Sequence, residues 1–330
     1  MTVLVTGGTG FVAGWCIAGL LDRGYTVRTT VRDLGRAPHV LAQFPGSDGR
    51  LEVVAADLTA DAGWREAMAD LEVVLHVASP MGGGDHTDAD ALIIPARDGA
   101  RRIIAAAATS GVPRVVMTSS GAAATPPPGA TGEFDESLWT NPDQPGLDAY
   151  RRSKAIAERA AWDELAAHPG PTTLTTILPG AIFGPLRSPE ARSSAQVIAQ
   201  LMRPGPGLPR VGLQIVDVRD LADLHIAAME NPAAAGKRFL AVAGNLWMRE
   251  VAELIRDDDP MRKVTTRELP DWLVRLAARF QPELTQLVPM LGRRYTYSTA
   301  AARTILGWHP RPVEETVLDT VVSLRTFDLA

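Results

Sequence analysis

Short apolar stretches alternate with amphipathic ones along the first 180 residues of the chain. The apolar stretches are rich in Val, Ile, Leu and Thr, and they predict strands at residues 2–6, 26–31, 51–57, 73–79, 114–120 and 172–179. Helical spacing of apolar positions predicts helices between them, at about 10–23, 36–43, 62–70 and 88–110, and over the segment that carries Tyr150 and Lys154. Strands that alternate with helices form βαβ units, so this part of the chain predicts a doubly wound parallel sheet, the Rossmann fold.

The alternation weakens after Pro179. Residues 218–230 look helical, and residues 239–244 form a candidate late strand. We therefore expect one domain over residues 1–180, with its sheet completed by later segments at about 211–245. Residues 181–330 would mainly form a smaller C-terminal lobe, interleaved with the first domain.

Two further segments have a less regular pattern of apolar and polar residues. The proline-rich segment 125–147 is predicted to be a long loop. Residues 271–291 carry apolar residues at helical spacing, broken by Pro282 and Pro289. We expect one apolar stripe of this segment to pack inside the lobe: Trp272, Leu273, Leu276 and Phe280.

Composition narrows the classes of protein. The 330 residues carry a net charge of −5, which argues against a nucleic-acid surface and against an anionic membrane surface. No apolar run approaches the roughly 18 residues of a membrane-spanning helix, and no targeting segment is visible, so we expect a cytoplasmic protein. Cys16, the single cysteine, excludes an internal disulfide and is expected to be buried.

A glycine-rich stretch, "VTGGTGFVAG", follows the first strand and opens the first helix. Gly7 permits a tight turn, Gly10 lets the backbone approach a pyrophosphate, and Ala13 takes the third small position where helix meets sheet. The positive end of the helix then faces the phosphates. The residues predicted to contact a dinucleotide here are Gly7, Thr9, Gly10, Phe11 and Val12.

The end of the second strand bears on the choice of dinucleotide. NAD sites place an acid about 20 residues past the glycines, and that position aligns with Val31, followed by Arg32. A guanidinium at Arg32, with Arg36 nearby, suits a 2′-phosphate, so NADP(H) is favoured over NAD(H). Asp33 keeps NAD(H) open, because a small error in register would make it the ribose-binding acid.

The next two strands end at the same edge of the predicted sheet. Asp57 and Leu58 lie at the end of the third strand, where an adenine could rest. His76 lies inside the apolar fourth strand and is interpreted as a core histidine. The residues that follow it are predicted to lie close to the cofactor: Val77, Ala78 and Ser79.

Tyr150 and Lys154 are four residues apart and project from one face of a helix. An ammonium lowers the pKa of a nearby phenol, so Tyr150 could give a proton to an alkoxide that forms when hydride reaches a carbonyl carbon. Ser120, at the end of the fifth strand, could hydrogen-bond the carbonyl oxygen. These three residues are the predicted catalytic group. No metal site is predicted, since the one candidate cluster, Asp85, His86 and Asp88, lies in a glycine-rich loop.

A series of motifs in order resembles the extended short-chain dehydrogenase/reductase family. The closer resemblance is to its dihydroflavonol-4-reductase-like branch, which includes cinnamoyl-CoA reductases and microbial aldehyde and ketone reductases. The motifs that carry it are "VTGGTGFVAGW", "GYTVRTTVRD", "HVASPM", "RVVMTSS", "FDESLW", "YRRSKAIAERAAW", "ILPGAIFGP", "IVDVRDLADLHIAAME" and "LGWHPRPVEET".

The resemblance implies the same catalytic residues and further contacts. Pro179 and Ile182 would flank the nicotinamide, and Gln214 would touch substrate. Thr125 stands where plant dihydroflavonol reductases carry a substrate-binding asparagine, and Asp98 replaces a family asparagine. A flavonoid substrate is therefore not implied.

Three functions follow in order of preference. The first is an NADPH-dependent reductase of a small-molecule aldehyde or ketone, with residues 1–180 as the NADP-binding domain and the later lobe binding substrate. The second is an NAD-dependent nucleotide-sugar epimerase or dehydratase. Two residues argue against it: Val31 stands where such enzymes usually carry an acid, and Leu178 stands where an arginine before Pro179 is common. The third is a non-catalytic NADP-sensing protein. A monomer or a homodimer is expected.

Overall fold

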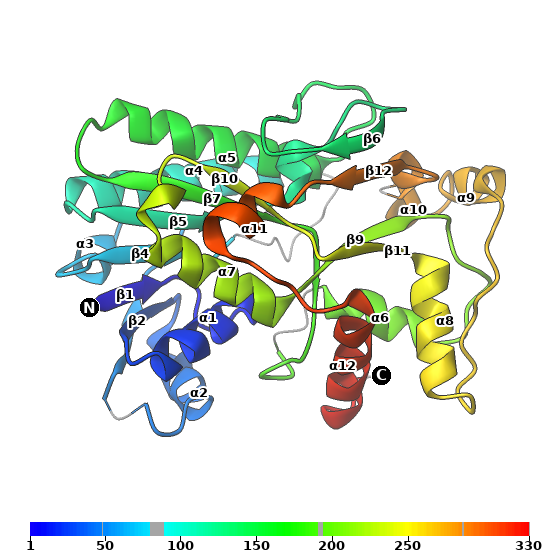
Figure 1. Cartoon of the computed structure of the whole chain (residues 1–330), viewed down its shortest axis with the longest axis horizontal. Helices are drawn as coiled ribbons and strands as arrows, with labels where there is room; N and C mark the ends of the chain where they lie inside the picture. Colours follow the sequence, from blue (N-terminus) through cyan, green and yellow to red (C-terminus); the bar gives the residue numbers. More distant parts are fainter. Residues whose placement is uncertain (48, 80–88, 191–193, 286, 330) are drawn as a thin grey trace.

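The computed structural model describes residues 1–47, 49–79, 89–190, 194–285 and 287–329 (Figure 1). A sheet of seven parallel strands lies at its centre. In spatial order the strands are β10 (Arg238–Ala241), β7 (Thr173–Pro179), β5 (Arg114–Thr118), β4 (Val73–His76), β1 (Thr2–Val5), β2 (Thr26–Val31) and β3 (Leu51–Ala55). The predicted α/β fold with a doubly wound parallel sheet is confirmed.

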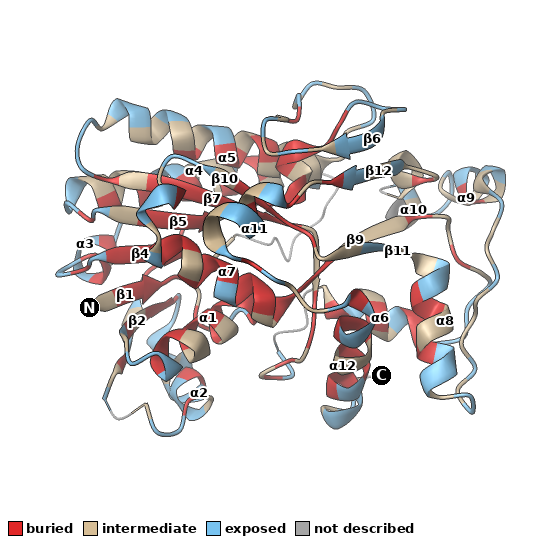
Figure 2. Cartoon of the chain, viewed as in Figure 1, coloured by how far each residue is buried: buried red, intermediate tan, exposed pale blue. Residues whose placement is uncertain are grey.

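Helices cover both faces of this sheet (Figure 1). One face carries α1 (Phe11–Asp22), α2 (Ala37–Ala42), α7 (Val218–Glu230) and α11 (Ala300–Leu306). The other face carries α3 (Trp64–Ala67), α4 (Ala89–Thr109) and α5 (Ala149–Ala167). Successive strand residues serve the two faces in turn, since Val3 and Val5 pack with α1 and α7 whereas Leu4 packs with α3 and α4. Figure 2 shows the strands buried between the layers.

The strand order reverses its direction between β1 and β4. In an open parallel sheet, the crevice at such a point, outside the carboxyl ends of the strands, is where ligands bind. The predicted chemical residues of the glycine turn and of the ends of β4 and β5 all belong to this edge.

Segments that follow β7 form a second lobe, apart from α7, β10 and α11, which belong to the central sheet and its helices (Figure 1). A three-stranded sheet there pairs β9 (Gly212–Asp217) parallel with β8 (Ala181–Phe183) and antiparallel with β11 (Gly244–Trp247). The described helices of this lobe are α6 (Ala195–Leu201), α8 (Met248–Asp258), α9 (Asp271–Ala277), α10 (Pro282–Thr285) and α12 (Val313–Thr326). β10 belongs to the central sheet, so the chain returns to the first domain after entering the lobe.

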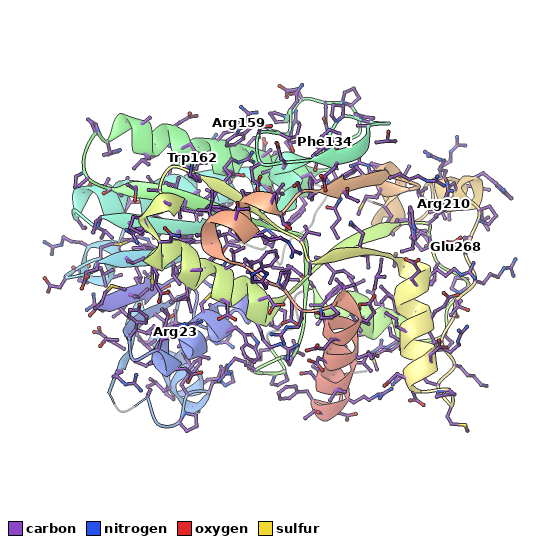
Figure 3. All side chains as sticks on the ribbon, viewed as in Figure 1. Arg23, Phe134, Arg159, Trp162, Arg210 and Glu268 are labelled. Carbon is purple, nitrogen blue, oxygen red and sulfur yellow. The ribbon has the colours of Figure 1, made fainter. Side chains whose placement is uncertain are left out.

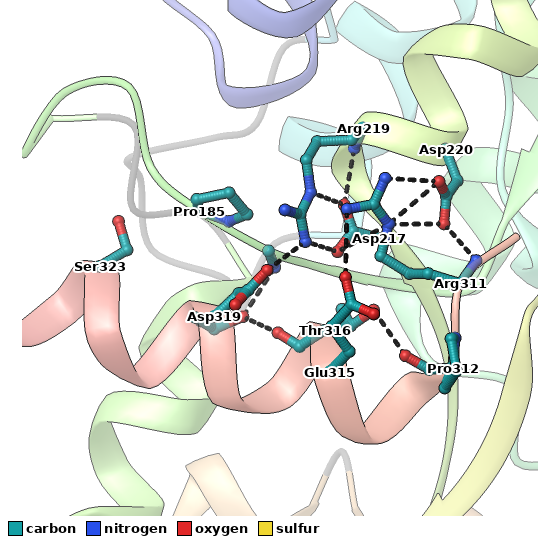
Figure 4. Close-up of polar contacts among 12 residues, drawn as sticks. Pro185, Asp217, Arg219, Asp220, Arg311, Pro312, Glu315, Thr316, Asp319 and Ser323 are labelled. Atoms are coloured by element: carbon teal, nitrogen blue, oxygen red, sulfur yellow. Dashed lines mark hydrogen bonds and ion pairs between the residues drawn. The ribbon is translucent and has the colours of Figure 1, made fainter.

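Ion pairs at the start of α7 fasten the C-terminal helix α12 of the lobe to this helix of the central sheet (Figure 4). The Asp217 carboxylate, fully buried, accepts hydrogen bonds from the Arg219 backbone at 2.8 Å and from its guanidinium at 2.7 Å. Arg219 also reaches Asp319 of α12 at 2.6 Å, and Arg311 binds Asp220 of α7 at 2.9 Å. The "IVDVRDLADLH" motif is therefore a structural junction.

Of the expectations for the less regular segments, the long loop is interrupted by one short strand, and the packing of the apolar stripe is wrong. The 125–147 segment contains β6 (Thr131–Phe134), which pairs parallel with β12 (Arg294–Tyr297). The apolar stripe does not pack: Trp272, Leu276 and Phe280 are 66%, 45% and 80% exposed. The reason is that α9 is short and only Val274 among its residues is buried against a core cluster.

Other sequence expectations concern the chain as a whole. Cys16 is buried, as expected, and burial raises the pKa of its thiol to about 12. Within the described ranges, every helix is too short or too polar to cross a bilayer. The cytoplasmic location and the choice between monomer and homodimer stay predictions.

Candidate active site

The glycine turn between β1 and α1 is tightly held. Gly7 has φ +76°, and a Cβ atom there would lie 2.9 Å from the Cβ of Ala78. Its amide donates to the Thr30 hydroxyl at 2.9 Å, which fastens the turn to β2. Both the backbone conformation and the space therefore require glycine at residue 7.

Gly10 is the N-cap residue of α1 and provides no side-chain cap. The first amides of this 12-residue helix, at Phe11 and Val12, are thus left for an anion, as in dinucleotide-binding turns. Phe11, Val12 and Ala13 are buried, so the start of the helix is pressed onto the sheet, and Thr9 is half-buried in the turn. This arrangement fits a pyrophosphate.

The end of β2 carries an exposed arginine and a carboxylate that is hydrogen-bonded within its own turn. Val31 is buried, whereas Arg32 is exposed at the strand end. Asp33 accepts a hydrogen bond from the Gly35 amide at 2.9 Å and caps a short turn. Arg36 is paired with Glu190. Arg36 and Asp33 are therefore engaged by neighbouring groups, whereas the Arg32 side chain is exposed at the strand end.

The end of β3 is braced by local contacts. The Thr59 backbone amide, followed by its hydroxyl, holds the pKa of Asp57 below its usual range. Leu58 is buried, and a Cβ atom on Gly99 of α4 would lie 3.2 Å from its Cβ. The helix thus approaches Leu58 closely, which explains a glycine at residue 99.

The end of β4 is organised by a threonine of the neighbouring strand. The Thr6 hydroxyl accepts from the amides of Val77 and Ala78, at 3.0 and 2.9 Å, and contacts His76 Nδ1 at 3.0 Å. His76 is 4% exposed, and burial, reinforced by Lys154, lowers its pKa to about 3. This agrees with the interpretation of His76 as a neutral core histidine.

The three predicted catalytic residues lie around one site. Ser120 and Tyr150 line the same cavity, of about 520 Å³. Lys154 Nζ lies 5.7 Å from the centroid of the Tyr150 ring and donates to Ser79 Oγ at 2.7 Å. Ser120 begins a short 3-10 turn, η2 (Gly121–Ala124), and accepts from the Ala122 amide at 3.1 Å. A hydroxyl, a phenol and an ammonium thus converge at the ends of β4 and β5.

A buried ion pair lies beneath this group. The Glu158 carboxylate, on the same helix as Tyr150, is fully buried and pairs with Arg238 of β10 at 2.8 Å. Ser119 and Thr176 each donate a hydroxyl to it at 2.7 Å. Ser119 therefore points into the core, which leaves Ser120 for the cavity. Glu158 and Arg238 were not predicted from the sequence, because nothing local shows that residues 80 positions apart meet.

Tyr297 was also missed. Its hydroxyl donates to the carbonyls of Gly121 and Ala124, at 2.8 and 2.9 Å, and so holds the turn that follows Ser120. Burial raises its pKa well above 10. An aromatic residue in a short polar strand carries no signal of this role.

Three of the four predicted substrate and nicotinamide contacts line the cavity, and one does not. Pro179, Thr125 and Gln214 line the cavity, whereas Ile182, in β8, packs against the main core instead. Thr125 is 2% exposed, and its hydroxyl donates to the Ala122 carbonyl at 3.1 Å. Gln214 Nε2 donates to a backbone carbonyl at 3.3 Å.

Some predictions fall on residues 80–88, outside the described residues. They are the shaping of the cavity by the loop after β4 and the cluster of Asp85, His86 and Asp88. Within the described ranges, no group of three or more His, Cys, Asp or Glu side chains is placed to hold a metal ion.

Comparison with known sequences identifies the family to which these motifs belong. The model of the NAD dependent epimerase/dehydratase family matches residues 3–243. The ketoreductase azaE of Aspergillus niger is 32% identical over 348 residues, covering 98% of this chain and 97% of its own. The dihydroflavonol 4-reductase of Zea mays is 33% identical, covering 81% of this chain and 76% of its own.

Solved structures are similar over the whole chain. The yeast methylglyoxal/isovaleraldehyde reductase Gre2, complexed with NADPH, has a TM-score of 0.84 at 25% identity and full coverage of both chains. Gre2 of Candida albicans in complex with NADPH has a TM-score of 0.82 at 27% identity, covering 99% of each chain.

Proposed function

The chain belongs to the NAD-dependent epimerase/dehydratase family and is an NAD(P)-dependent oxidoreductase that uses NADP(H), and on this premise we propose that it reduces an aldehyde or ketone to an alcohol. The observation that carries the proposal is that Ser120 and Tyr150 line one cavity while the Lys154 ammonium lies 5.7 Å from the Tyr150 ring centroid. Relatives named as reductases support it.

The residues of the glycine turn would hold the cofactor. The uncapped amides that follow Gly10 suit its pyrophosphate, and exposed Arg32 suits its 2′-phosphate. Bound there, the nicotinamide would supply a hydride for the carbonyl carbon. Lys154, held by Ser79, is our candidate to bind the nicotinamide ribose hydroxyls.

Tyr150 is the proposed general acid. It would donate its phenolic proton to the substrate oxygen as negative charge develops there. The Lys154 ammonium, 5.7 Å from the ring centroid, stabilises the resulting phenolate and so favours the transfer. Ser120 would donate a hydrogen bond to the same oxygen and stabilise its developing charge. In the direction of alcohol oxidation, the Tyr150 phenolate would take the proton back.

The other two functions make different demands. An NAD-dependent epimerase or dehydratase would need an acid for the ribose, yet Val31 is buried and Asp33 caps a turn. A sensing protein would not need the Tyr150–Lys154 pair. Both observations support the reductase.

The test is NADPH consumption with a panel of neutral aldehydes and ketones. We expect Tyr150→Phe to lower kcat by at least about a hundredfold, because the proton donor is lost. Tyr25→Phe is the matched control, since that phenol contacts Glu230 at 2.8 Å and does not line the cavity. Unchanged turnover in Tyr150→Phe would remove the proposed acid. Tightly bound NAD in the purified protein, without NADPH turnover, would favour the epimerase instead.

A further inference from the structure

The cavity beside Ser120 and Tyr150 is cationic. Three arginines line it, Arg151, Arg293 and Arg294, and the lining residues that the structure describes include no Asp or Glu. The whole chain carries a net charge of −5, so the cavity has the opposite sign to the molecule. A cleft lined by one sign of charge concentrates ligands of the other sign.

Neighbouring arginines are already neutralised by carboxylates. Arg151 is paired with Asp148, the N-cap residue of α5. Arg210, labelled in Figure 3, pairs with Asp271 at 2.7 Å. Both guanidinium groups are therefore engaged in structural ion pairs, on α5 and in the lobe, and leave little charge for a ligand.

Arg293 differs from these two. Its Nε donates to the Pro289 carbonyl, but its Nη1 is enclosed and has no hydrogen-bond partner among the described residues. In the described part of the chain it also forms no ion pair. Arg293 lines the cavity, and no described carboxylate neutralises it, so its positive charge is available to an anionic ligand there.

The backbone fixes where this arginine stands. Gly292 has φ +67°, and a Cβ atom there would lie 2.8 Å from Arg210 Nη2. The Gly292 amide donates to the Arg210 carbonyl at 2.8 Å. Because Arg210 is itself held by Asp271, the segment that presents Arg293 is anchored before any ligand arrives.

We propose that the substrate is a carbonyl compound that carries a carboxylate, and that Arg293 binds this carboxylate. The inference rests on the proposed function, because it concerns what the same cavity holds. A guanidinium donates charge-assisted hydrogen bonds to a carboxylate, and these are stronger than bonds between neutral groups. The carbonyl lies at Ser120 and Tyr150 and the carboxylate at Arg293, within one cavity of about 520 Å³. Exposed Arg294 adds attraction for the incoming anion.

The experiment compares matched substrates, 3- and 4-formylbenzoate and their methyl esters, with NADPH. We expect the better carboxylate to have a kcat/KM at least about tenfold above that of its ester. Arg293→Gln should lower this ratio by about tenfold to a hundredfold, mainly through KM, because a charge-assisted hydrogen bond is lost. Arg293→Lys keeps the positive charge but replaces the planar guanidinium with an ammonium, so its ratio of kcat/KM for acid over ester should be intermediate. Arg275→Gln, an exposed position on α9, should keep the wild-type ratio.

The outcomes separate this inference from the proposed function. Equal kcat/KM for acid and ester, or a ratio that Arg293→Gln leaves unchanged, overturns the carboxylate site while the reductase stands. If no carbonyl compound is reduced, the proposed function fails. Calorimetric titration with 4-formylbenzoate then decides the inference alone. Binding that is lost in Arg293→Gln and kept in Arg275→Gln supports it, and absence of binding to the wild type refutes it.

Discussion

The buried carboxylate of Glu158 offers a sharp test of how the site is held. It accepts four hydrogen bonds, from the Ser119 and Thr176 hydroxyls and from two nitrogens of Arg238. The change Glu158→Gln keeps the shape and one oxygen, but it replaces the other oxygen with a donor. The Arg238 guanidinium, 8% exposed, is then left without its counter-charge.

The expected loss follows from these contacts. Removing one partner of a buried ion pair costs about 3–5 kcal/mol of unfolding free energy. Arg238 retains other interactions that reduce the loss, since it donates to the carbonyls of Glu136 and Leu138 and lies 3.7 Å from the Trp139 ring centroid. We therefore expect a loss of about 3 kcal/mol, the lower end of that range.

Urea unfolding, followed by tryptophan fluorescence and circular dichroism, measures this loss. Glu253→Gln is the control, because Glu253 forms an exposed pair with Arg249 at 2.9 Å. That control should lose less than about 0.5 kcal/mol. The double variant Glu158→Gln/Arg238→Met should lose less than the sum of its single changes, since the two residues are coupled. A loss below about 1 kcal/mol in Glu158→Gln would refute the reasoning.

Four further predictions concern single residues. Gly7→Ala should weaken NADPH binding far more than Gly24→Ala in a fluorescence titration, because both have positive φ but only Gly7 would meet a neighbouring Cβ at 2.9 Å; equal effects would contradict this. Arg32→Ser should lower the preference for NADPH over NADH by about tenfold to a hundredfold in kcat/KM, and an unchanged preference would assign the 2′-phosphate elsewhere. Tyr297→Phe leaves two carbonyls without their donor, so it should lower both kcat and, by about 1–3 kcal/mol, the unfolding free energy measured in urea; a variant as stable and active as the wild type would contradict this. Burial lowers the pKa of His225 to about 4, so only the unfolded chain takes up its proton between about pH 6.5 and 4. Its contribution to stability is complete above that window and falls within it by up to about 1.4 kcal/mol per pH unit, and His225→Gln should flatten the dependence of the urea midpoint on pH.

The central sheet was predictable because its information is local. Strands such as β1 and β5 are continuous apolar runs, and each is followed by a turn whose residues are set by the turn itself. Gly7 and Ser120 stand at such positions, so their placement at one edge follows from parallel topology, and the spacing of Tyr150 and Lys154 puts both on one face of a helix. Their catalytic and binding roles stay proposals.

The remaining features depend on partners far away in sequence. β6 has four residues, three of them exposed, and forms only because β12 lies beside it. Glu158 has no distinguishing feature in the sequence of its helix, and only the fold brings Arg238 of β10 next to it. The exposed face of α9 is the opposite case, because apolar spacing shows that a helix forms but does not show what covers it.

The bond from Tyr297 to the turn after Ser120 has a consequence for synthesis of the chain. The dinucleotide turn needs only β1, α1 and their neighbours, and these leave the ribosome early. The serine's turn lacks its anchoring phenol until some 176 further residues have been added. A nascent chain could therefore bind a nucleotide well before it can catalyse the proposed reduction.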